Sequence, residues 1–118
     1  MMTINRIEIM GTVGNVRISS FEDRQSLNFS VVTNYAYKGR ESSPILETMW
    51  FNVAAWSGKS VSPEVISKID KGSDVRVLGR LREREYTTSD GTVRKVIEVV
   101  ASQVELVDSK EMMQPARV

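Results

Sequence analysis

A two-residue alternation of apolar and polar side chains is the feature of this sequence that most limits its fold. Over residues 46–57, the odd positions form an unbroken apolar series of Met49, Phe51, Val53 and Ala55. Successive side chains of a β-strand point to opposite faces, so this run is typical of a strand with one face in a core. The even positions include Trp50 and Trp56, which the alternation places together on the other face.

The same alternation predicts further strands along the chain. We expect strands over residues 4–10 with 16–18, 26–34, 46–57, 74–86 and 93–107. Gly11 and Gly14 interrupt the first of them, which indicates a bulge or a bend, and a second irregularity is expected near Ala101 and Ser102. Residues 35–44 are predicted to be a mobile hairpin loop, and residues 89–91 a hairpin turn.

One segment, residues 62–70, has the signals of a short helix. Ser62 is suited to cap it, and Pro63 is suited to its first turn. Val65, Ile66 and Ile69 follow at helical spacing and form an apolar stripe, and Gly72 is placed to end the helix.

The resulting order is three strands, one short helix and two strands, which is the order of an OB-fold. The fold class predicted is therefore all-β, a five-stranded OB-fold barrel with one short helix between strands 3 and 4. A small β-sandwich is the alternative, and a single helix in this position disfavours it. At 118 residues and 41% hydrophobic residues, the chain suits one domain with one core. We expect this domain over residues 1–107 and a polar, flexible tail over residues 108–118.

The composition excludes several kinds of chemistry. The chain has no cysteine and no histidine, which rules out disulfides, ordinary zinc sites and the common Ser-His and Cys-His nucleophile pairs. No catalytic residue, metal or other cofactor is expected. A metal-dependent nuclease using Asp23, Asp70, Asp74 and Asp90 stays as an alternative, although these acids are scattered along the sequence. The sequence shows no signal peptide and no membrane-spanning run, so a cytoplasmic protein that does not bind membranes is expected.

Positive charge is concentrated in one strand although 16 basic residues nearly balance 15 acidic ones. The even positions of residues 74–86 place four arginines and a tyrosine along one face: Arg76, Arg80, Arg82, Arg84 and Tyr86. Guanidinium groups pair with phosphates, and aromatic rings accept unstacked bases of any sequence. The strip therefore suits a single strand of nucleic acid, or it is a solvated face whose arginines pair with Glu83 and Glu85.

The aromatic residues leave two interpretations open. An outward pair of tryptophans marks either a ligand face or a subunit contact, and the pattern alone favours neither. Tyr37 lies beside Lys38 and Arg40, which favours a ligand role. Its odd position matches the core side of its strand, however, so an outward orientation requires the strand to bend or to leave the barrel first.

Several short motifs in the chain resemble those of the bacterial single-stranded DNA-binding protein family. They are residues 5–11 followed by Gly14, then 50–53, 56–59, 71–75 and 79–82. Each motif is weak alone, but their order and spacing match over residues 4–107. The resemblance implies an OB-fold that binds single-stranded DNA in replication, recombination and repair. It also implies a homotetramer, with a dimer as the alternative, and a nucleoid-associated location in the cytoplasm.

The resemblance also assigns roles to residues. Base stacking falls on Trp50, Trp56, Tyr86 and Tyr37. The two tyrosines stand where tryptophan is common, so their stacking should be weaker. Phosphate contacts are assigned to Arg80, Arg82, Arg84, Lys59, Arg94, Lys38 and Arg40.

The chain departs from the family pattern at its C-terminus. The family usually continues into a linker with an acidic tip that recruits partner enzymes, whereas this sequence ends at residues 114–118 without one. Recruitment through such a tip is therefore not expected. The alternatives are a dimeric accessory protein that resembles primosomal replication protein N, and a structural module whose tryptophans are buried in a protein interface.

Overall fold

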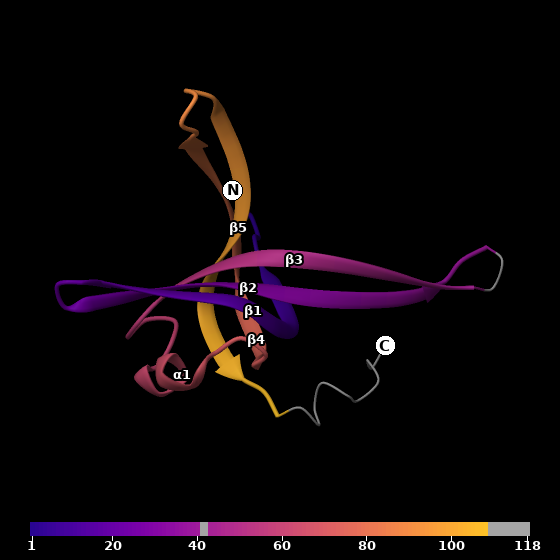
Figure 1. Ribbon diagram of the computed structural model, residues 1–118, viewed down its shortest axis with the longest axis horizontal. Coiled ribbons are helices and arrows are strands. Elements are labelled where there is room, and N and C mark those ends of the chain that lie inside the picture. The colour runs from indigo at the N-terminus through magenta and orange to yellow at the C-terminus, as the bar shows by residue number, and fades with distance from the viewer. Residues whose placement is uncertain (41–42, 109–118) are drawn as a thin grey trace.

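Five strands close into a barrel, as the alternation predicts. The structure is a computed structural model that describes residues 1–40 and 43–108. Its elements are β1 (Ile7–Phe21), β2 (Arg24–Lys38), β3 (Pro44–Trp56), α1 (Pro63–Lys68), β4 (Asp74–Thr87) and β5 (Val93–Leu106). The strands follow one another around the barrel in the order β1-β2-β3-β5-β4 (Figure 1). The predicted all-β barrel with one short helix between the third and fourth strands is confirmed.

The core lies inside this closed sheet. Branched side chains from every strand fill it, including Val13, Leu27, Val31, Val53, Val77 and Val99, each at most 2% exposed. Val53 of β3 and Val99 of β5 are partners in the parallel β3–β5 ladder, which closes the barrel. Burial of these side chains is the main stabilising term of the fold.

Two irregularities bend the barrel strands, both near the positions predicted. The β1–β2 register shifts between Val13 and Val16, next to Gly14. Contrary to the expectation of two short runs, however, β1 continues through this shift as one strand. In β5, Gly79 faces Ala101 while Leu78 faces Gln103, so Ser102 is the extra residue of a bulge. Because a bulge adds one residue, it reverses which parity faces the core.

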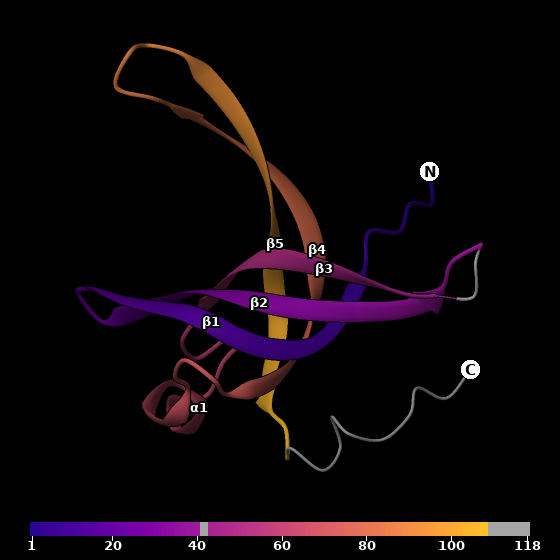
Figure 2. The same cartoon turned by 45° about the vertical axis from the view of Figure 1, so that its right-hand side comes forward.

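The prediction of a loop over residues 35–44 is wrong. The β2–β3 ladder continues to the pair Lys38 and Pro44, so the connection shrinks to residues 39–43. The alternation fails to show this because residues 35–38 no longer have a core to face, and Tyr35, Ala36 and Tyr37 are all exposed. The two strands project from the barrel as the β2–β3 arm, and β4 and β5 project as a second arm in another direction (Figures 1 and 2).

The same projection corrects the predicted core face of the third strand. Val53 and Ala55 are buried, but Met49 is 58% exposed because it belongs to the β2–β3 arm. The apolar series therefore extends beyond the barrel, and only its C-terminal part faces the core. Periodicity records which side chains share a face and does not record where the core ends.

Helix α1 begins as predicted and ends earlier. The backbone N–H of Val65 donates to the Ser62 hydroxyl at 3.3 Å, which confirms Ser62 as the cap. Instead of reaching Gly72, the helix ends at Lys68, and Ile69 turns inward to the core at 7% exposure. Gly72 has φ +92° and serves the following turn into β4. Among the described residues, no helix is long and apolar enough to cross a membrane.

The predicted turn at residues 89–91 joins β4 to β5. Gly91 has φ +86°, and the backbone N–H of Thr88 donates to the Thr92 carbonyl at 2.9 Å. The carboxylate of Asp90 accepts from the Thr88 hydroxyl and from the Thr92 backbone N–H. These hydrogen bonds, the Thr88 one first, hold the pKa of Asp90 below its ordinary value.

Candidate nucleic-acid interface

The outer surface of β1, β2 and β3 carries both tryptophans. Trp50 is paired with Val32 and Trp56 with Ser26 in the β2–β3 ladder, and the indoles are 58% and 38% exposed. Trp56 follows Trp50 by six positions along β3, which is about 20 Å of strand. We call this surface the sheet face and define it by Arg17, Asn28, Ser30, Trp50, Asn52 and Trp56.

Glycine in the β1 irregularity makes room for the Trp50 ring. A Cβ atom on Gly14 would lie 2.5 Å from Cζ3 of Trp50 and 2.8 Å from Oγ of Ser30. The indole therefore lies directly over the β1 backbone, which limits the ways in which it can move on that side. A ring with fewer orientations loses less entropy when a base stacks on it.

Trp56 is supported by a cation. The guanidinium carbon of Arg24 lies 5.5 Å from the centroid of the Trp56 ring, within the usual range of a cation–π contact. Arg24 is the first residue of β2, at the opposite end of the sheet face from Trp50. The two indoles are thus held by different means, one by backbone contact and one by a guanidinium.

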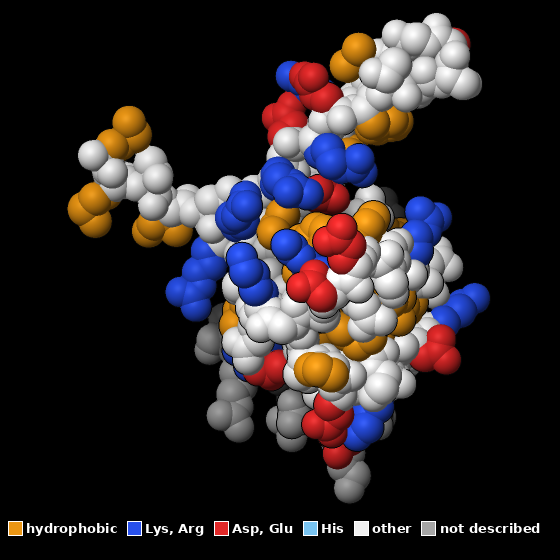
Figure 3. Space-filling view, turned by 90° about the vertical axis from the view of Figure 1, so that its left-hand side faces the viewer, with side chains coloured by type: hydrophobic (Ala, Val, Ile, Leu, Met, Phe, Trp, Pro, Cys, Tyr) orange, Lys and Arg blue, Asp and Glu red, His pale blue; other side chains and the backbone are white. Residues whose placement is uncertain are grey.

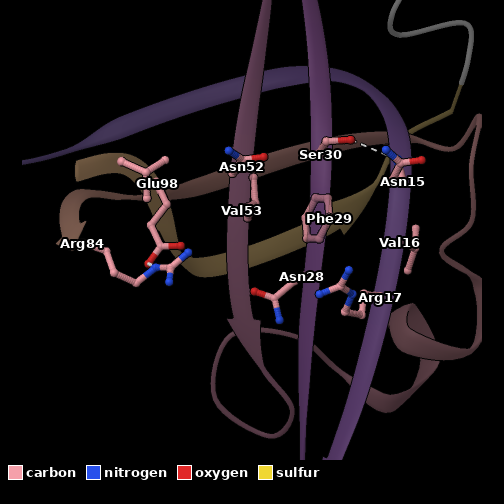
Figure 4. A pocket seen from close by; sticks show the side chains of 11 residues that line it. Asn15, Val16, Arg17, Asn28, Phe29, Ser30, Asn52, Val53, Arg84 and Glu98 are labelled. Carbon is pink, nitrogen blue, oxygen red and sulfur yellow. Dashed lines mark hydrogen bonds and ion pairs between the residues drawn. The ribbon is translucent and has the colours of Figure 1, made fainter. Parts of the chain in front are cut away.

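A polar groove lies between the two tryptophans. It has a volume of about 500 Å³ and is lined by side chains of β1, β2 and β3 together with Arg84, Val96 and Glu98. Figure 4 shows Arg84 and Glu98 on one side, Asn52 and Ser30 in the middle, and Asn15 and Arg17 on the other. The backbone N–H of Asn15 donates to the Ser30 hydroxyl at 3.0 Å, which ties the β1 irregularity to β2. The groove joins the sheet face to the arginines of β4.

The arginines of β4 are engaged by one carboxylate. Nε of Arg82 donates to Oε1 of Glu98 at 3.0 Å, and Nε of Arg84 lies 3.5 Å from the same oxygen. Glu98 is 8% exposed, whereas about half of each arginine side chain reaches solvent. Arg82 also donates from Nη2 to this oxygen, so Nη1 of Arg82 and the terminal nitrogens of Arg84 remain as donors for another anion.

This pairing corrects the expected partners of the strip. Glu83 does not pair with an arginine beside it in β4; it bonds Lys95 across the ladder at 3.2 Å. Adjacent residues of a strand point to opposite faces, so neither Glu83 nor Glu85 shares the arginine face. Arg76 forms an ion pair outside the arginine group, because its Nη2 lies 2.5 Å from Oε2 of Glu8 in β1. Arg80 is exposed and has no ion pair with any described residue.

Basic side chains collect where the β4–β5 arm meets the barrel, as the blue atoms in Figure 3 show. Farther along the arm, Tyr86 and Arg94 are ladder partners and so share one face. Arg80, Arg82 and Arg84 have the same parity as Tyr86. The structure therefore brings Tyr86, Arg94 and the three arginines onto one face of one arm, with Tyr86 43% exposed.

Residues of the other arm stand apart from this group. Tyr37 is 39% exposed, so the outward orientation that the sequence left open is present. Its hydroxyl donates to Glu47 at 3.3 Å, and its ring lies 5.9 Å from that of Tyr35. The alternation of the ladder puts Tyr37 on the opposite face of the ribbon from Trp50. Lys38 ends β2, and Arg40 lies in the connection beyond it.

The remaining assignments fall in turns. Lys59 is exposed in the segment after β3, and its backbone N–H donates to the Trp56 carbonyl at 3.4 Å. Asp70 bonds the Lys71 N–H at 2.8 Å, and Asp74 accepts from the Thr12 hydroxyl at 2.9 Å. Within residues 1–40 and 43–108, no group of three or more acidic side chains is placed to hold a metal ion.

Comparison with known proteins agrees with this geometry. Residues 4–107 match the sequence profile of the single-strand binding protein family. The chain belongs to this family. The resemblance inferred from the short motifs is therefore confirmed over the same range of residues.

Sequence relatives within the family are distant. A single-stranded DNA-binding protein of Rickettsia felis is 31% identical over 117 residues, covering 92% of this chain and 75% of that protein. One from Neisseria meningitidis serogroup A is 22% identical over 111 residues, covering 92% of this chain. The chain spans 63% of the length of that relative.

Solved structures support the fold of this family member. The Plasmodium falciparum SSB complex with ssDNA superposes with a TM-score of 0.79 at 22% identity, covering 92% of this chain and 98% of the other. A deletion mutant of the single-stranded DNA binding protein from Thermus aquaticus gives a TM-score of 0.75 at 14% identity, covering 91% and 52% of the two chains. At these identities the comparisons establish the barrel.

Sequence reasoning missed several side chains of this surface: Arg17, Arg24, Asn28, Asn52 and Glu98. For Asn28 and Asn52 a signal was available, because each shares its parity with the outward residues of its own strand. For Arg17 the parity is reversed by the β1 irregularity, which the sequence does not place to the residue. The Glu98 pairing depends on the β4–β5 register, which neither strand specifies alone.

Proposed function

We propose that this chain binds single-stranded DNA without reading its sequence, along a path over the sheet face and the β4–β5 arm. The observation that carries the proposal is the shared groove, in which Arg84 of the arm meets the face that exposes Trp50 and Trp56. Bases would stack on the indoles while arginines contact phosphates, a combination that suits a flexible single strand. Family membership supports the same function.

Individual roles follow from position. Trp50 and Trp56 are the principal stacking residues, with Tyr86 next in the series on the β4–β5 arm. Arg80, Arg82, Arg84 and Arg94 are the phosphate contacts on that arm, and Lys59 follows Trp56 closely enough to add one. We place Tyr37, Lys38 and Arg40 on a separate segment of the DNA path, because the β2–β3 arm projects away from the barrel (Figure 2).

The wider assignment follows from the family. We propose a binding protein that carries no catalytic residues and serves replication, recombination and repair in the cytoplasm as a homotetramer. Residues 1–107 would form the binding domain. The flexible tail proposed for residues 108–118 lies outside the described residues, apart from Asp108.

Tryptophan emission tests the proposed function directly. Titration with poly(dT) at low salt should quench the fluorescence, because both tryptophans lie on the proposed path. Duplex DNA of matched length is the control and should quench far less. Unchanged emission at saturating poly(dT), with binding also absent in a filter or mobility assay, would reject the function and favour a protein interface.

Light scattering tests the assembly. A tetramer is the expected result for this family member. A dimer would instead favour the accessory protein that resembles primosomal replication protein N, and the fluorescence titration would then separate the two by the strength of tryptophan quenching.

A further inference from the structure

The sheet face does not end at Trp56. Beyond it, the β1–β2 ladder ends in the pair Phe21 and Arg24, with Ser19 and Ser26 as the preceding pair on the same face. Ser26 is in turn the partner of Trp56 in β3. Phe21 and Arg24 therefore lie one row past Trp56, on the same outer surface.

The irregularity in β1 is what brings Phe21 to this surface. Before it, the odd positions Ile9 and Val13 are buried in the core. After it, Val16 is the partner of the buried Phe29, so the even positions of β1 turn toward the core. The odd positions Arg17 and Phe21 are thereby moved to the outside, and Phe21 is 59% exposed.

Phe21 and Trp56 line one groove. It has a volume of about 570 Å³, and Arg24 lies in it with its guanidinium over the Trp56 ring. An aromatic ring that is exposed beside a two-residue turn has an unfavourable hydration free energy and does not contribute to a core. Such a ring beside a second ring and a guanidinium is a surface on which a planar group stacks well.

The charges around the groove indicate what kind of group fits. Glu22 and Asp23 form the turn and also line the groove, and Arg24 is its one cation. Two carboxylates beside one guanidinium disfavour a phosphate, since like charges repel. A nucleobase carries no charge and offers a large flat face, so it meets no such penalty.

We propose that Phe21, Arg24 and Trp56 form a base-stacking subsite, the hairpin subsite, for one nucleobase at the end of the DNA path. The proposal rests on the proposed function above, because it assumes a single strand that already crosses the sheet face. Phe21 stacks on the base, and the guanidinium of Arg24 holds the Trp56 ring beside it.

Removal of the Phe21 ring is the first test. Phe21→Ala should weaken binding of long dT oligonucleotides about fivefold or more, the lower end of what one base stack contributes. Oligonucleotides too short to reach from Trp50 to the hairpin should bind as they do to the wild type. The loss should be equal at low and high salt, because stacking releases no counterions.

Ile97→Ala is the matched control. Ile97 is 63% exposed, close to the value for Phe21, but it lies on the face of the β4–β5 arm away from the arginines. This variant should bind every length like the wild type. Circular dichroism of both variants should match the wild type, since neither side chain belongs to the core.

A fluorescent reporter gives an independent readout. Phe21→Trp, in a chain whose two tryptophans are replaced by phenylalanine, should lose emission on adding long dT oligonucleotides and keep it with short ones. If Phe21→Ala binds all lengths like the wild type and the reporter emission is unchanged, the hairpin subsite does not exist. If the wild type itself binds no single-stranded DNA, the proposed function fails, and the subsite fails with it.

Discussion

The sheet face and the β4–β5 arm bring different chemistry to one groove. The sheet face has two exposed indoles, asparagine amides and two cations, Arg17 and, at its end, Arg24. The arm has one tyrosine and the arginine series, and its charges are organised by Glu98. Base stacking on the sheet face should therefore contribute affinity that salt does not weaken. Phosphate contacts on the arm should contribute affinity that falls as the salt concentration rises.

The difference also shows how each surface is held in place. Trp50 and Trp56 rest on neighbours that the barrel fixes, a glycine backbone and a guanidinium on β2. The arginines of the arm lie outside the barrel and would be free to move without Glu98. A buried carboxylate beside the proposed phosphate path weakens the attraction of this surface for DNA. It also holds two guanidinium groups side by side, and each of them keeps N–H donors that can bind a phosphate.

The largest effect is expected on the sheet face. Trp50→Ala should weaken single-stranded DNA binding by about 1–3 kcal/mol, or about 5- to 150-fold. The loss should be nearly constant across a salt series, because the indole carries no charge. Equilibrium titration at several salt concentrations measures both properties.

Trp50→Phe is the companion variant, since it keeps a smaller ring on the same backbone. It should recover part of the lost affinity. If Trp50→Ala instead flattened the salt dependence, the division of roles between the two surfaces would be wrong.

The next effect belongs to the arm. Replacing Arg82 and Arg84 with alanine should flatten the slope of log K against log[salt] by about 1.4 units, if each arginine contacts one phosphate of a single strand. Affinity should fall most at low salt and converge with that of the wild type at high salt. An unaltered slope would mean that these two arginines pair with Glu98 and do not contact phosphate.

Glu98 makes a control necessary for that experiment. Removing both arginines leaves a carboxylate that is 8% exposed without its partners, which destabilises the fold. Adding Glu98→Gln to the double variant removes the carboxylate charge that has lost its partners. Thermal unfolding should then return toward the wild-type midpoint, while the flattened salt slope should remain.

A smaller effect comes from the support beneath Trp50. Gly14→Ala places a methyl group against the far edge of the indole, which must shift. Binding should weaken by less than about 1.4 kcal/mol, or less than about tenfold, because the ring is displaced but still present. In a Trp50→Ala background the same change should have no effect on binding, and a persistent loss there would show that Gly14 acts through something else.

Much of the fold could be predicted because alternation, capping and turn signals are local. Ser62, the turn at residues 89–91 and the irregularities in β1 and β5 all followed from a few neighbouring residues. The ends of the arms could not be predicted, since Met49 and Tyr37 continue the apolar alternation of their strands after the barrel has ended. Alternation describes the ribbon, and burial depends on what packs against it.

The candidate site shows a similar limit. Trp50 and Trp56 were found by parity because β3 has no irregularity between them. Arg17 and Phe21 were missed because one extra residue in β1 exchanges the two faces of the strand. The pairing of Arg82 with Glu98 could not be predicted, because it depends on the register of β4 with β5, which arises only when the barrel closes.

The smallest effect is expected at the tip of the β4–β5 arm, where hydrogen bonds hold the pKa of Asp90 below its ordinary value of 3.8. A lowered pKa in the folded state means that the carboxylate stabilises the turn. This contribution is complete above the ordinary pKa and is lost as the pH falls through the lower folded value. Asp90→Asn should therefore speed hydrogen exchange of the Thr92 N–H at neutral pH, and the difference from the wild type should shrink on acidification.

That variant also separates the two surfaces. Asp90 lies in the turn beyond Tyr86 and Arg94, so a loosened turn should affect only the outer part of the arm. Quenching of Trp50 and Trp56 by short oligonucleotides should be unchanged, because the barrel fixes both rings. A loss of quenching in Asp90→Asn would mean that the arm positions the sheet face, and the two surfaces would then have to be treated as one.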